Sequence, residues 1–349
     1  MKQASSIDAA MAIDFRRAVV SDAQALAEMF AQTYGETSHP LRDPQRIHEL
    51  VNRSENICLL GLRRTRIVAC VGITHYPWND SFELGRAITV PEFRGQGLAV
   101  QLVQKCLDWL REVFQPAVFW GTPRVARIYD ICCHDVSPQM IATGHDGGSN
   151  YAHGKPETHL LIFGSTQDPG PGHVRPPWKS RERSDCVEQR IWRPLGWSSQ
   201  PGRYPAEFLT GPRNSDAKRH KNLVYRFDST CPSRALELLD FESSAPSETT
   251  FLRQLQSLLK LCSAARHVSF SLLADKIDLL ERLVEIGFVV TAYMPGWHLA
   301  TGRRYDCLRM VLHLIPENAL GNGMEPIIAS LDLELADWFR APCRPLSLC

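Results

Sequence analysis

One segment decides how the N-terminal half of the chain folds: Ile88-Thr89-Val90-Pro91-Glu92-Phe93-Arg94-Gly95-Gln96-Gly97-Leu98-Ala99. A strand-like apolar run ends at Val90, and from Leu98 onward the apolar residues recur with the helical period. The turn between them leads directly into the start of a helix, where backbone N–H groups have no helical acceptor. The helix dipole favours an anion there, and Gly95 and Gly97 let a phosphate approach the backbone closely. The segment therefore predicts a loop that binds phosphate or pyrophosphate.

Strand and helix patterns surround this loop on both sides. A strand, two helices and three further strands precede it, and a helix, a short strand and another helix follow it. Asp43 before Pro44 is a typical start of the second helix. The predicted strands are residues 13–17, 57–62, 67–74, 82–90 and 117–120, and the predicted helices begin near residues 21, 44, 98 and 122. This order is typical of a mixed α/β domain.

The loop resembles the acetyl-CoA signature of the GNAT superfamily of N-acetyltransferases. Arg94-x-x-Gly97-x-Ala99 has the family's spacing of Arg or Gln, two residues, Gly, one residue, and Gly or Ala. A P-loop would need Gly-Lys-Ser/Thr, and a dinucleotide fingerprint would need a third glycine in another register. The alternative is an ordinary turn between a strand and a helix. The resemblance extends from Ile13 to about Gly164 and implies an α/β (α+β) fold, with a mixed, mostly antiparallel sheet flanked by helices.

The resemblance also implies the acyl donor and where it binds. The donor would be acetyl-CoA or another short acyl-CoA, with no metal involved. In this family the fourth strand splays from the fifth, and the pantetheine arm adds along the fourth like an extra strand. Pantetheine would then bind Ile88, Thr89 and Val90. The pyrophosphate would bind the loop residues Arg94, Gly95, Gln96, Gly97, Leu98 and Ala99.

Two residues are the candidates for acid–base catalysis. Acylation of an amine requires a neutral amine and a protonated or stabilised thiolate. Glu83, eleven positions before Arg94, corresponds to a base that some family members carry, or else it is an exposed strand carboxylate. Tyr129 corresponds to the family's acid in Asn-x-x-Ala-x-x-Leu-Tyr, or else it is a packed aromatic residue. Thr122, Val125 and Ile128 replace the first three residues of that pattern.

Other polar groups in this half are expected to border the acceptor site. Adjacent cysteines in Cys132-Cys133-His134 cannot easily bind one zinc, so we expect no metal there. His145, Asp146 and His153 lie in a glycine-rich stretch that we interpret as a loop between the last two strands. Tyr34, Thr37 and His39 fall where the family's first helices border the acceptor. Their types fit amino acids, amino sugars, polyamines or a protein amine alike.

The C-terminal half resembles a second, degenerate GNAT-like unit in tandem with the first. Its Gly287-Phe288 pair matches the family's exit from the fourth helix, but no acyl-CoA motif precedes the helix at Phe251. Leu283 stands where the acid tyrosine would be. We expect this unit to pack on the first or to shape the acceptor pocket. The predicted division is a tail at 1–12, a catalytic domain at 13–165, a Pro-rich basic linker at 166–215, the degenerate unit at 216–318 and an extension at 319–349.

The linker region has its own alternatives. It could be an ordered excursion over the surface or a patch for an anionic ligand, and Trp178, Trp192 and Trp197 indicate that part of it packs inward. The stretch from Leu331 to Phe339 could add a terminal helix.

Composition limits the remaining classes of function. The 349 residues carry a net charge of +1, which predicts neither nucleic-acid binding nor attachment to a membrane surface. No apolar run approaches the length of a membrane span, and no signal sequence is apparent. The 11 cysteines are mostly scattered, which indicates a reducing compartment, so we expect a cytoplasmic protein.

The sequence thus predicts a CoA-dependent N-acyltransferase, in the simplest case an N-acetyltransferase. The acceptor would be the amine of a small molecule rather than of a protein, and a homodimer is an open alternative. The competing hypothesis is a non-catalytic acyl-CoA-binding regulator or scaffold, which the imperfect match around Tyr129 supports.

Overall fold

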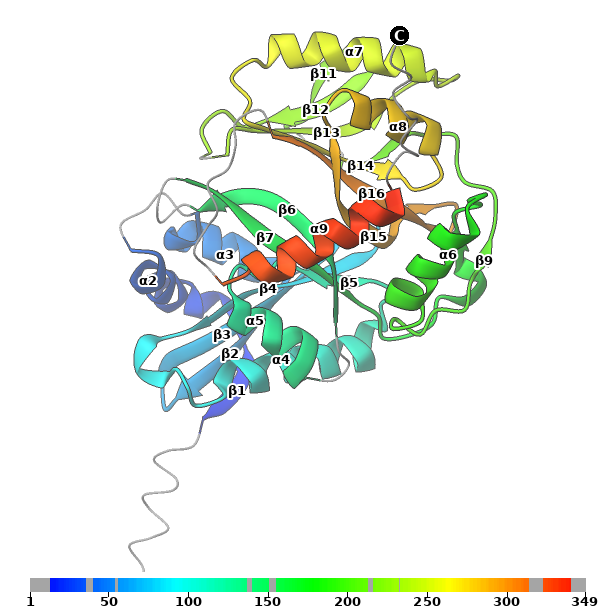
Figure 1. The fold of residues 1–349 in the computed structure, drawn as a ribbon. Helices are drawn as coiled ribbons and strands as arrows, with labels where there is room; N and C mark the ends of the chain where they lie inside the picture. Colours follow the sequence, from blue (N-terminus) through cyan, green and yellow to red (C-terminus); the bar gives the residue numbers. More distant parts are fainter. Residues whose placement is uncertain are drawn as a thin grey trace, which may run out of the picture.

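The computed structural model describes residues 13–35, 40–53, 56–136, 140–150, 155–212, 216–231, 233–313 and 323–339. Figure 1 shows two α/β units, with the C-terminal unit above the N-terminal one. A single twisted sheet runs through both, and helices flank it, so the expected mixed and mostly antiparallel sheet is confirmed.

The N-terminal unit contains seven strands in the order β1-β2-β3-β4-β5-β7-β6. All neighbours are antiparallel except β4 and β5, which are parallel. The strands are β1 (Asp14–Arg17), β2 (Asn56–Arg63), β3 (Arg66–Tyr76), β4 (Ser81–Thr89), β5 (Phe119–Gly121), β6 (Ile141–Asn150) and β7 (Lys155–Gly164). Strands β1 to β5 correspond to the five strands for which the sequence predicts bounds, with small shifts at the ends.

Four helices pack against this unit. They are α2 (Ala23–Tyr34), α3 (Pro44–Asn52), α4 (Leu98–Trp109) and α5 (Ala126–Asp130), and short 3-10 or π segments extend them at η1 (Val20–Asp22), η2 (Pro40–Arg42), η4 (Leu110–Phe114) and η5 (Ile131–Asp135). The start of α3 agrees with its prediction, since the Asp43 side chain accepts from the backbone N–H of Gln45 and Pro44 is the first helical residue. Helix α4 lies on β3 and β4, and the loop before it follows the end of β4.

Strands β4 and β5 separate partway along their length. They pair only from Phe82 opposite Phe119 to Leu84 opposite Gly121. Beyond this point β5 has ended, and β4 continues to Thr89 paired with β3 alone. A bulge interrupts that pairing next to Arg86, whose φ of 54° lies in the left-handed region. The separation leaves one edge of β4 free for a ligand.

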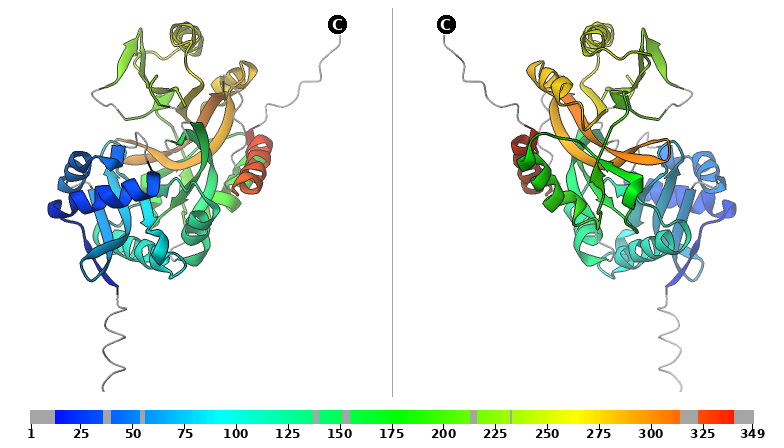
Figure 2. Two further views of the ribbon diagram at one scale, coloured as in Figure 1. Left: turned by 90° about the vertical axis from the view of Figure 1, so that its left-hand side faces the viewer. Right: turned by 90° about the vertical axis from the view of Figure 1, so that its right-hand side faces the viewer.

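The C-terminal unit repeats this strand order. Its strands run β15-β16-β14-β13-β12-β11, which matches β6-β7-β5-β4-β3-β2, and β13 and β14 are the parallel pair. Its elements are β11 (Lys218–His220), β12 (Leu223–Phe227), β13 (Ala235–Phe241), α7 (Glu248–Leu261), β14 (His267–Leu273), α8 (Ile277–Glu285), β15 (Val289–Ala300) and β16 (Arg303–His313). The repeated order supports a tandem arrangement, and the two views in Figure 2 show the units side by side.

The two units meet where β6 pairs with β15, at Gly144 opposite Ala292. The prediction that the glycine-rich stretch is a loop is wrong, because Gly144, Gly147 and Gly148 lie within β6. A Cβ at Gly144 would lie 2.1 Å from the carbonyl oxygen of Thr291, so only glycine permits this approach of the second unit. His153 lies outside the described residues.

The segment predicted as a linker is ordered and packs against the second unit. It contains η6 (Gly170–Gly172), β8 (His173–Arg175), α6 (Arg181–Val187), η7 (Glu188–Trp192), β9 (Gln200–Pro201) and β10 (Leu209–Thr210). Trp192 and Trp197 are buried, as expected. The carboxylate of Asp306 accepts from His173 Nε2 at 2.6 Å and from Trp192 Nε1 at 3.0 Å. These bonds attach the segment to the core of the C-terminal unit.

Helix α9 (Glu325–Phe339) crosses the junction of the two units in front of β6 and β15 (Figure 1). It includes the stretch in which the sequence predicts a terminal helix. Asp332 on this helix contacts His145 on β6, with 2.8 Å between Oδ1 and Nε2. Among the helices of the described residues, none is long and apolar enough to cross a membrane.

Candidate functional site

The loop between β4 and α4 has the geometry of an anion site. After the short segment η3 (Pro91–Phe93), Gly95 and Gly97 take left-handed φ values of 78° and 74°, and α4 begins at Leu98. No side chain caps this helix, and its first internal bond runs from Gln101 N–H to Gly97 C=O. The preceding N–H groups have no helical acceptor, so they are available to phosphate oxygens.

The loop is held in place by its own residues. Phe93 is buried, and the guanidinium of Arg63 lies 5.3 Å from the centre of its ring. Arg94 Nε donates to the carbonyl oxygen of Thr89 at 3.1 Å, which fixes the base of the turn. Because these contacts already hold the loop, an anionic ligand could bind its N–H groups with little change in the backbone.

A cavity of about 660 Å³ opens beside this loop and along the free part of β4. Residues from β4, the loop and α5 line it, and seven of them are predicted donor-binding residues: Ile88, Thr89, Arg94, Gly95, Gly97, Leu98 and Ala99. Val90 is buried instead, with its N–H bonded to Val68, and the Gln96 side chain donates to Glu92 C=O. The cavity has the size of a ligand pocket, and its free strand edge leaves backbone groups of β4 open to an extended ligand.

Glu83 lies in an adjoining cavity of about 290 Å³. The two cavities share the lining residues Ala87, Val125 and Ile128, so they meet at the point where β4 and β5 separate. Tyr76 Oη donates a hydrogen bond to Glu83 Oε2 at 2.6 Å. Burial, and then the charge of Glu83, raise the pKa of Tyr76, so its hydroxyl stays protonated and donating. The structure thus places Glu83 beside the cavity of the loop.

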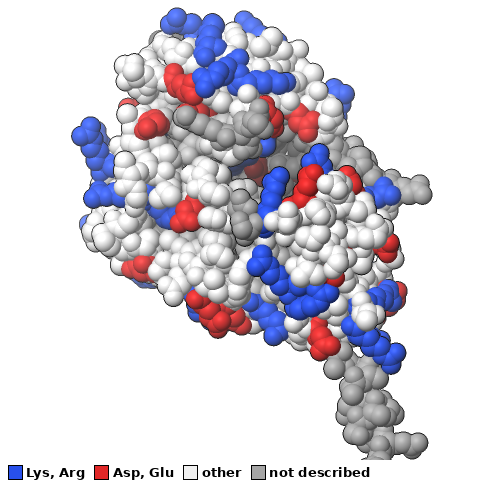
Figure 3. Space-filling view, turned by 180° about the vertical axis from the view of Figure 1, so that it is seen from behind, with Lys and Arg blue, Asp and Glu red and all other residues white. Residues whose placement is uncertain are grey.

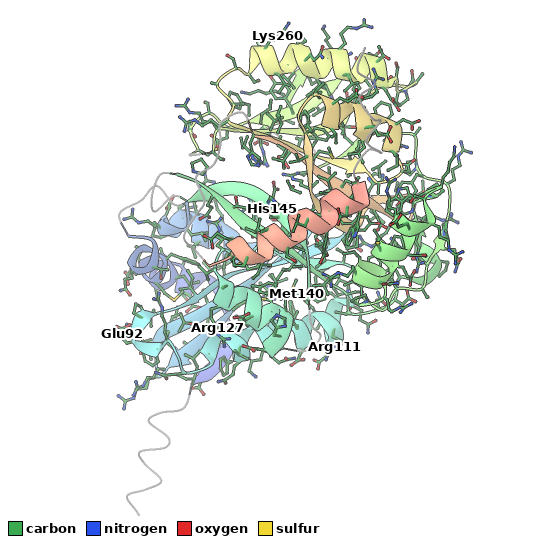
Figure 4. All side chains as sticks on the ribbon, in the orientation of Figure 1. Glu92, Arg111, Arg127, Met140, His145 and Lys260 are labelled. Atoms are coloured by element: carbon green, nitrogen blue, oxygen red, sulfur yellow. The ribbon has the colours of Figure 1, made fainter. Side chains whose placement is uncertain are left out.

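The structure does not place Tyr129 in that cavity. Its ring packs edge-on against His134 with centroids 5.4 Å apart, and it lines a separate cavity of about 590 Å³ under α9. Burial raises the pKa of Tyr129. In Figure 4 the label Arg127 marks the helix that carries Tyr129. The label Met140 marks a residue that lines the cavity under α9.

The cysteine pair after this helix is buried. Burial raises the pKa of Cys132 to about 12, which makes it unreactive as a nucleophile at neutral pH. Within the described ranges, no group of three His, Cys, Asp or Glu residues could hold a metal ion. Thr37 and His39 lie outside those ranges, and so does the side chain of Tyr34.

The second unit supports the Glu83 site from the other side. Arg304 Nη1 donates to the carbonyl oxygen of Asn79 at 2.9 Å, in the turn that joins β3 to β4. Asn79 Nδ2 in turn donates to Trp297 C=O at 3.2 Å. The turn that positions Tyr76 and Glu83 is therefore held by β15 and β16.

The equivalent cleft of the second unit is filled. Strand β13 pairs with β14 only as far as Leu238 opposite Phe270. Beyond this point β10 takes its place, with Leu209 opposite Leu272 and Thr210 opposite Ser271. A short strand of the chain itself therefore lies where β13 and β14 separate.

Sequence reasoning missed two residues of the site, Tyr76 and Arg86. Tyr76 could have been found by pairing the predicted strands across their turn, since that register places Thr74 opposite Glu83 and Tyr76 diagonal to it. The bulge at Arg86 leaves no comparable signal in one sequence.

Comparisons with known proteins agree with this geometry. Residues 23–125 match the model of the acetyltransferase (GNAT) family. No curated protein is a significant match to the sequence.

Among solved structures, the chain is similar to a ribosomal-protein-S5-alanine acetyltransferase from Vibrio fischeri (18% identity, 45% of this chain and 94% of that chain covered, TM-score 0.38). It is also similar to the PaiA N-acetyltransferase from Thermoplasma acidophilum in complex with coenzyme A (14% identity, 44% and 98% covered, TM-score 0.35). A spermidine N-acetyltransferase mutant from Vibrio cholerae is a third (12% identity, 44% and 94% covered, TM-score 0.37). The family match and the geometry of the loop thus agree that residues 23–125 are similar to the acetyltransferase (GNAT) family.

Proposed function

We propose that the protein is an N-acyltransferase that moves an acetyl or other short acyl group from acyl-CoA to the amine of a small molecule. One observation carries the proposal: the uncapped start of α4, with Gly95 and Gly97 in left-handed conformations, opens into the cavity beside the free edge of β4. Pyrophosphate would bind the N–H groups of the loop, and pantetheine would bind along Ile88 and Thr89. The thioester would then lie toward the Glu83 cavity.

Glu83 is the proposed base. It would take a proton from the ammonium form of the acceptor, directly or through water. The amine nitrogen then forms a bond with the thioester carbonyl carbon, and the C–S bond breaks. The nitrogen loses its second proton as the amide forms, and the thiolate of CoA leaves and takes up one proton, directly or through water. Free backbone N–H groups of β4 would polarise the carbonyl oxygen during the attack. Tyr76 would hold the Glu83 carboxylate toward the acceptor.

The source of the last proton is a separate question. Tyr129 is the sequence-based candidate, but it lines the cavity under α9 rather than that of the loop. A thiol with an ordinary pKa near 8.5 can leave as a thiolate and be protonated by water. The proposed reaction therefore does not depend on Tyr129.

The second candidate is a non-catalytic acyl-CoA-binding regulator, and the position of Tyr129 is the observation that favours it. The two functions differ in turnover. An enzyme releases free thiol from acetyl-CoA when a panel of amines is supplied, and a regulator binds acetyl-CoA without releasing thiol.

The test of the donor site is calorimetric titration with acetyl-CoA. Arg94→Glu should abolish measurable binding, because it places a carboxylate where the pyrophosphate would lie. The matched control is Arg181→Glu, since the Arg181 side chain is 94% exposed and remote from both cavities. Normal binding by Arg94→Glu would refute the loop assignment.

A further inference from the structure

Arg86 lines the cavity of Glu83, where the acceptor is proposed to bind, and its backbone conformation is unusual. It occupies the bulge of β4 with a φ of 54°, which is a strained conformation for a side chain other than glycine. Its guanidinium lies against Gly72 on β3, where a Cβ would approach Nε to 2.3 Å. The bulge and Gly72 together turn this side chain onto the sheet beside Glu83.

The Arg86 side chain is partly exposed, and part of its guanidinium is buried without a hydrogen-bond partner. Its Nε and Nη2 are buried and have no hydrogen-bond partner among the described residues. Buried polar groups without partners are rare, and an unpaired buried charge is strongly unfavourable. Arg86 also lines the cavity, so an anionic group of a ligand there would neutralise this guanidinium and could accept from it.

Basic and acidic residues of both units surround the cavity, and Arg124 pairs with Glu157 at 2.6 Å. Arg124 lines this cavity and also a neighbouring one of about 590 Å³, to which the second unit contributes Lys218 and Arg226. The positive charge of Arg226 lowers the pKa of Tyr76, so it opposes the rise that burial and Glu83 cause. Acidic residues are present as well, and Glu237 pairs with Arg226 at 2.6 Å. Figure 3 shows the molecule from behind, where Lys and Arg side chains border a hollow between the upper and lower parts.

We infer that the acceptor is an amine that also carries an anionic group, a carboxylate or a phosphate, which binds Arg86 while its amine faces Glu83. The inference rests on the proposed acyl transfer. Glu83 and Arg86 are three positions apart on one strand, at most about 10 Å along the chain, so a small zwitterion can contact both. The cavity volume of about 290 Å³ suits such a molecule. Arg86 would thus determine specificity, and it would not take part in the chemistry.

The test measures kcat/KM by thiol release for matched pairs of acceptors. A panel of amino acids is compared with the corresponding amino-acid amides, and phosphoethanolamine with ethanolamine. Wild type should prefer the anionic member of at least one pair by about 10- to 100-fold, the range expected for hydrogen bonds to a charged group. The pair with the larger preference identifies carboxylate or phosphate. Arg86→Gln should reduce that preference to about twofold, because the anionic member loses more than the neutral one, while Arg181→Gln should behave as wild type.

Binding of the products gives a second readout that needs no turnover. The protein saturated with CoA is titrated with two matched sets of products. These are N-acetyl amino acids with their amides, and N-acetyl phosphoethanolamine with N-acetylethanolamine. The anionic product should bind more tightly to wild type than to Arg86→Gln. Equal use of neutral and anionic acceptors, or an equal loss for both in Arg86→Gln, would overturn the inference while leaving the acyltransferase proposal intact. Failure to bind acetyl-CoA at all would instead refute the proposed function.

Discussion

Tyr76 and Glu83 form a hydrogen bond of 2.6 Å across the turn between β3 and β4, and this turn is held by Arg304 of the second unit. The pair connects the fold to the proposed chemistry, because the tyrosine fixes a carboxylate beside the donor cavity. The second unit thereby supports the site through this turn.

The first prediction concerns this pair. Glu83→Gln should lower kcat by about 10²- to 10⁴-fold, the usual range for loss of a general base, with acetyl-CoA affinity unchanged. Tyr76→Phe should lower kcat less, because the carboxylate remains but is no longer held. Steady-state thiol release and calorimetry measure the two quantities. Full activity of Glu83→Gln would exclude it as the base.

The second prediction compares two glycines with nearly the same backbone conformation. Gly97 has a φ of 74° and Gly302 a φ of 73°, and a methyl group added at either would meet no atom closer than 4.0 Å. Replacement by alanine should lower the free energy of unfolding by about 1–2 kcal/mol at either position, since a left-handed conformation disfavours a Cβ. Acetyl-CoA affinity should fall only for Gly97→Ala, because only this methyl group faces the proposed phosphate. Equal affinities of the two variants would show that the loop does not contact the donor.

The third prediction concerns Tyr129. Because its ring lines the cavity under α9, Tyr129→Phe should change kcat by less than about fivefold and should leave the pH profile of thiol release intact. A loss of about 100-fold or more, the effect expected for removal of a general acid, would restore Tyr129 to the catalytic site. Stability of the variant, measured by urea unfolding, is the control for a packing defect.

The fourth prediction concerns pH and His159 on β7. Burial lowers the pKa of His159 to about 4, from an ordinary value of 6.5. Below pH 6.5 the unfolded chain takes up a proton that the folded protein does not accept until about pH 4. Stability should therefore be unaffected by His159 above pH 6.5 and should fall by up to about 3 kcal/mol between pH 6.5 and 4.

Urea unfolding at a series of pH values checks this expectation. His159→Gln should reduce the change in stability between pH 6.5 and 4. His48→Gln, at a partly exposed position on α3, should leave that change as in wild type. The same slope in wild type and His159→Gln would show that other groups cause the acid sensitivity.

The sequence allowed prediction of those parts that depend on neighbouring residues in the chain. The loop from Arg94 to Ala99 could be read because glycines and a helix start lie within a few positions of each other. The cap at Asp43 and the helix that includes Leu331–Phe339 were predictable for the same reason. Contacts between distant segments could not be predicted. The glycines of β6 have the composition of a loop, and the approach of Ala292, His267 and His159 explains them.

The position of Tyr129 illustrates the same limit at the site. Its spacing along the helix matches the family pattern, yet the cavity that it lines is completed by Arg190, Glu334 and Trp338, which come much later in the chain. Arg86 depends on a bulge that shifts the strand register, and no local pattern in this sequence marks such a bulge.

The strand formed by Leu209 and Thr210 has a consequence for stoichiometry. A segment tethered to its own cleft has a high effective concentration, which for short connections reaches the millimolar range. A free ligand at micromolar concentration cannot displace it. The chain should therefore bind one equivalent of acetyl-CoA, with a single hyperbolic saturation curve, even though its architecture repeats the fold of the binding unit.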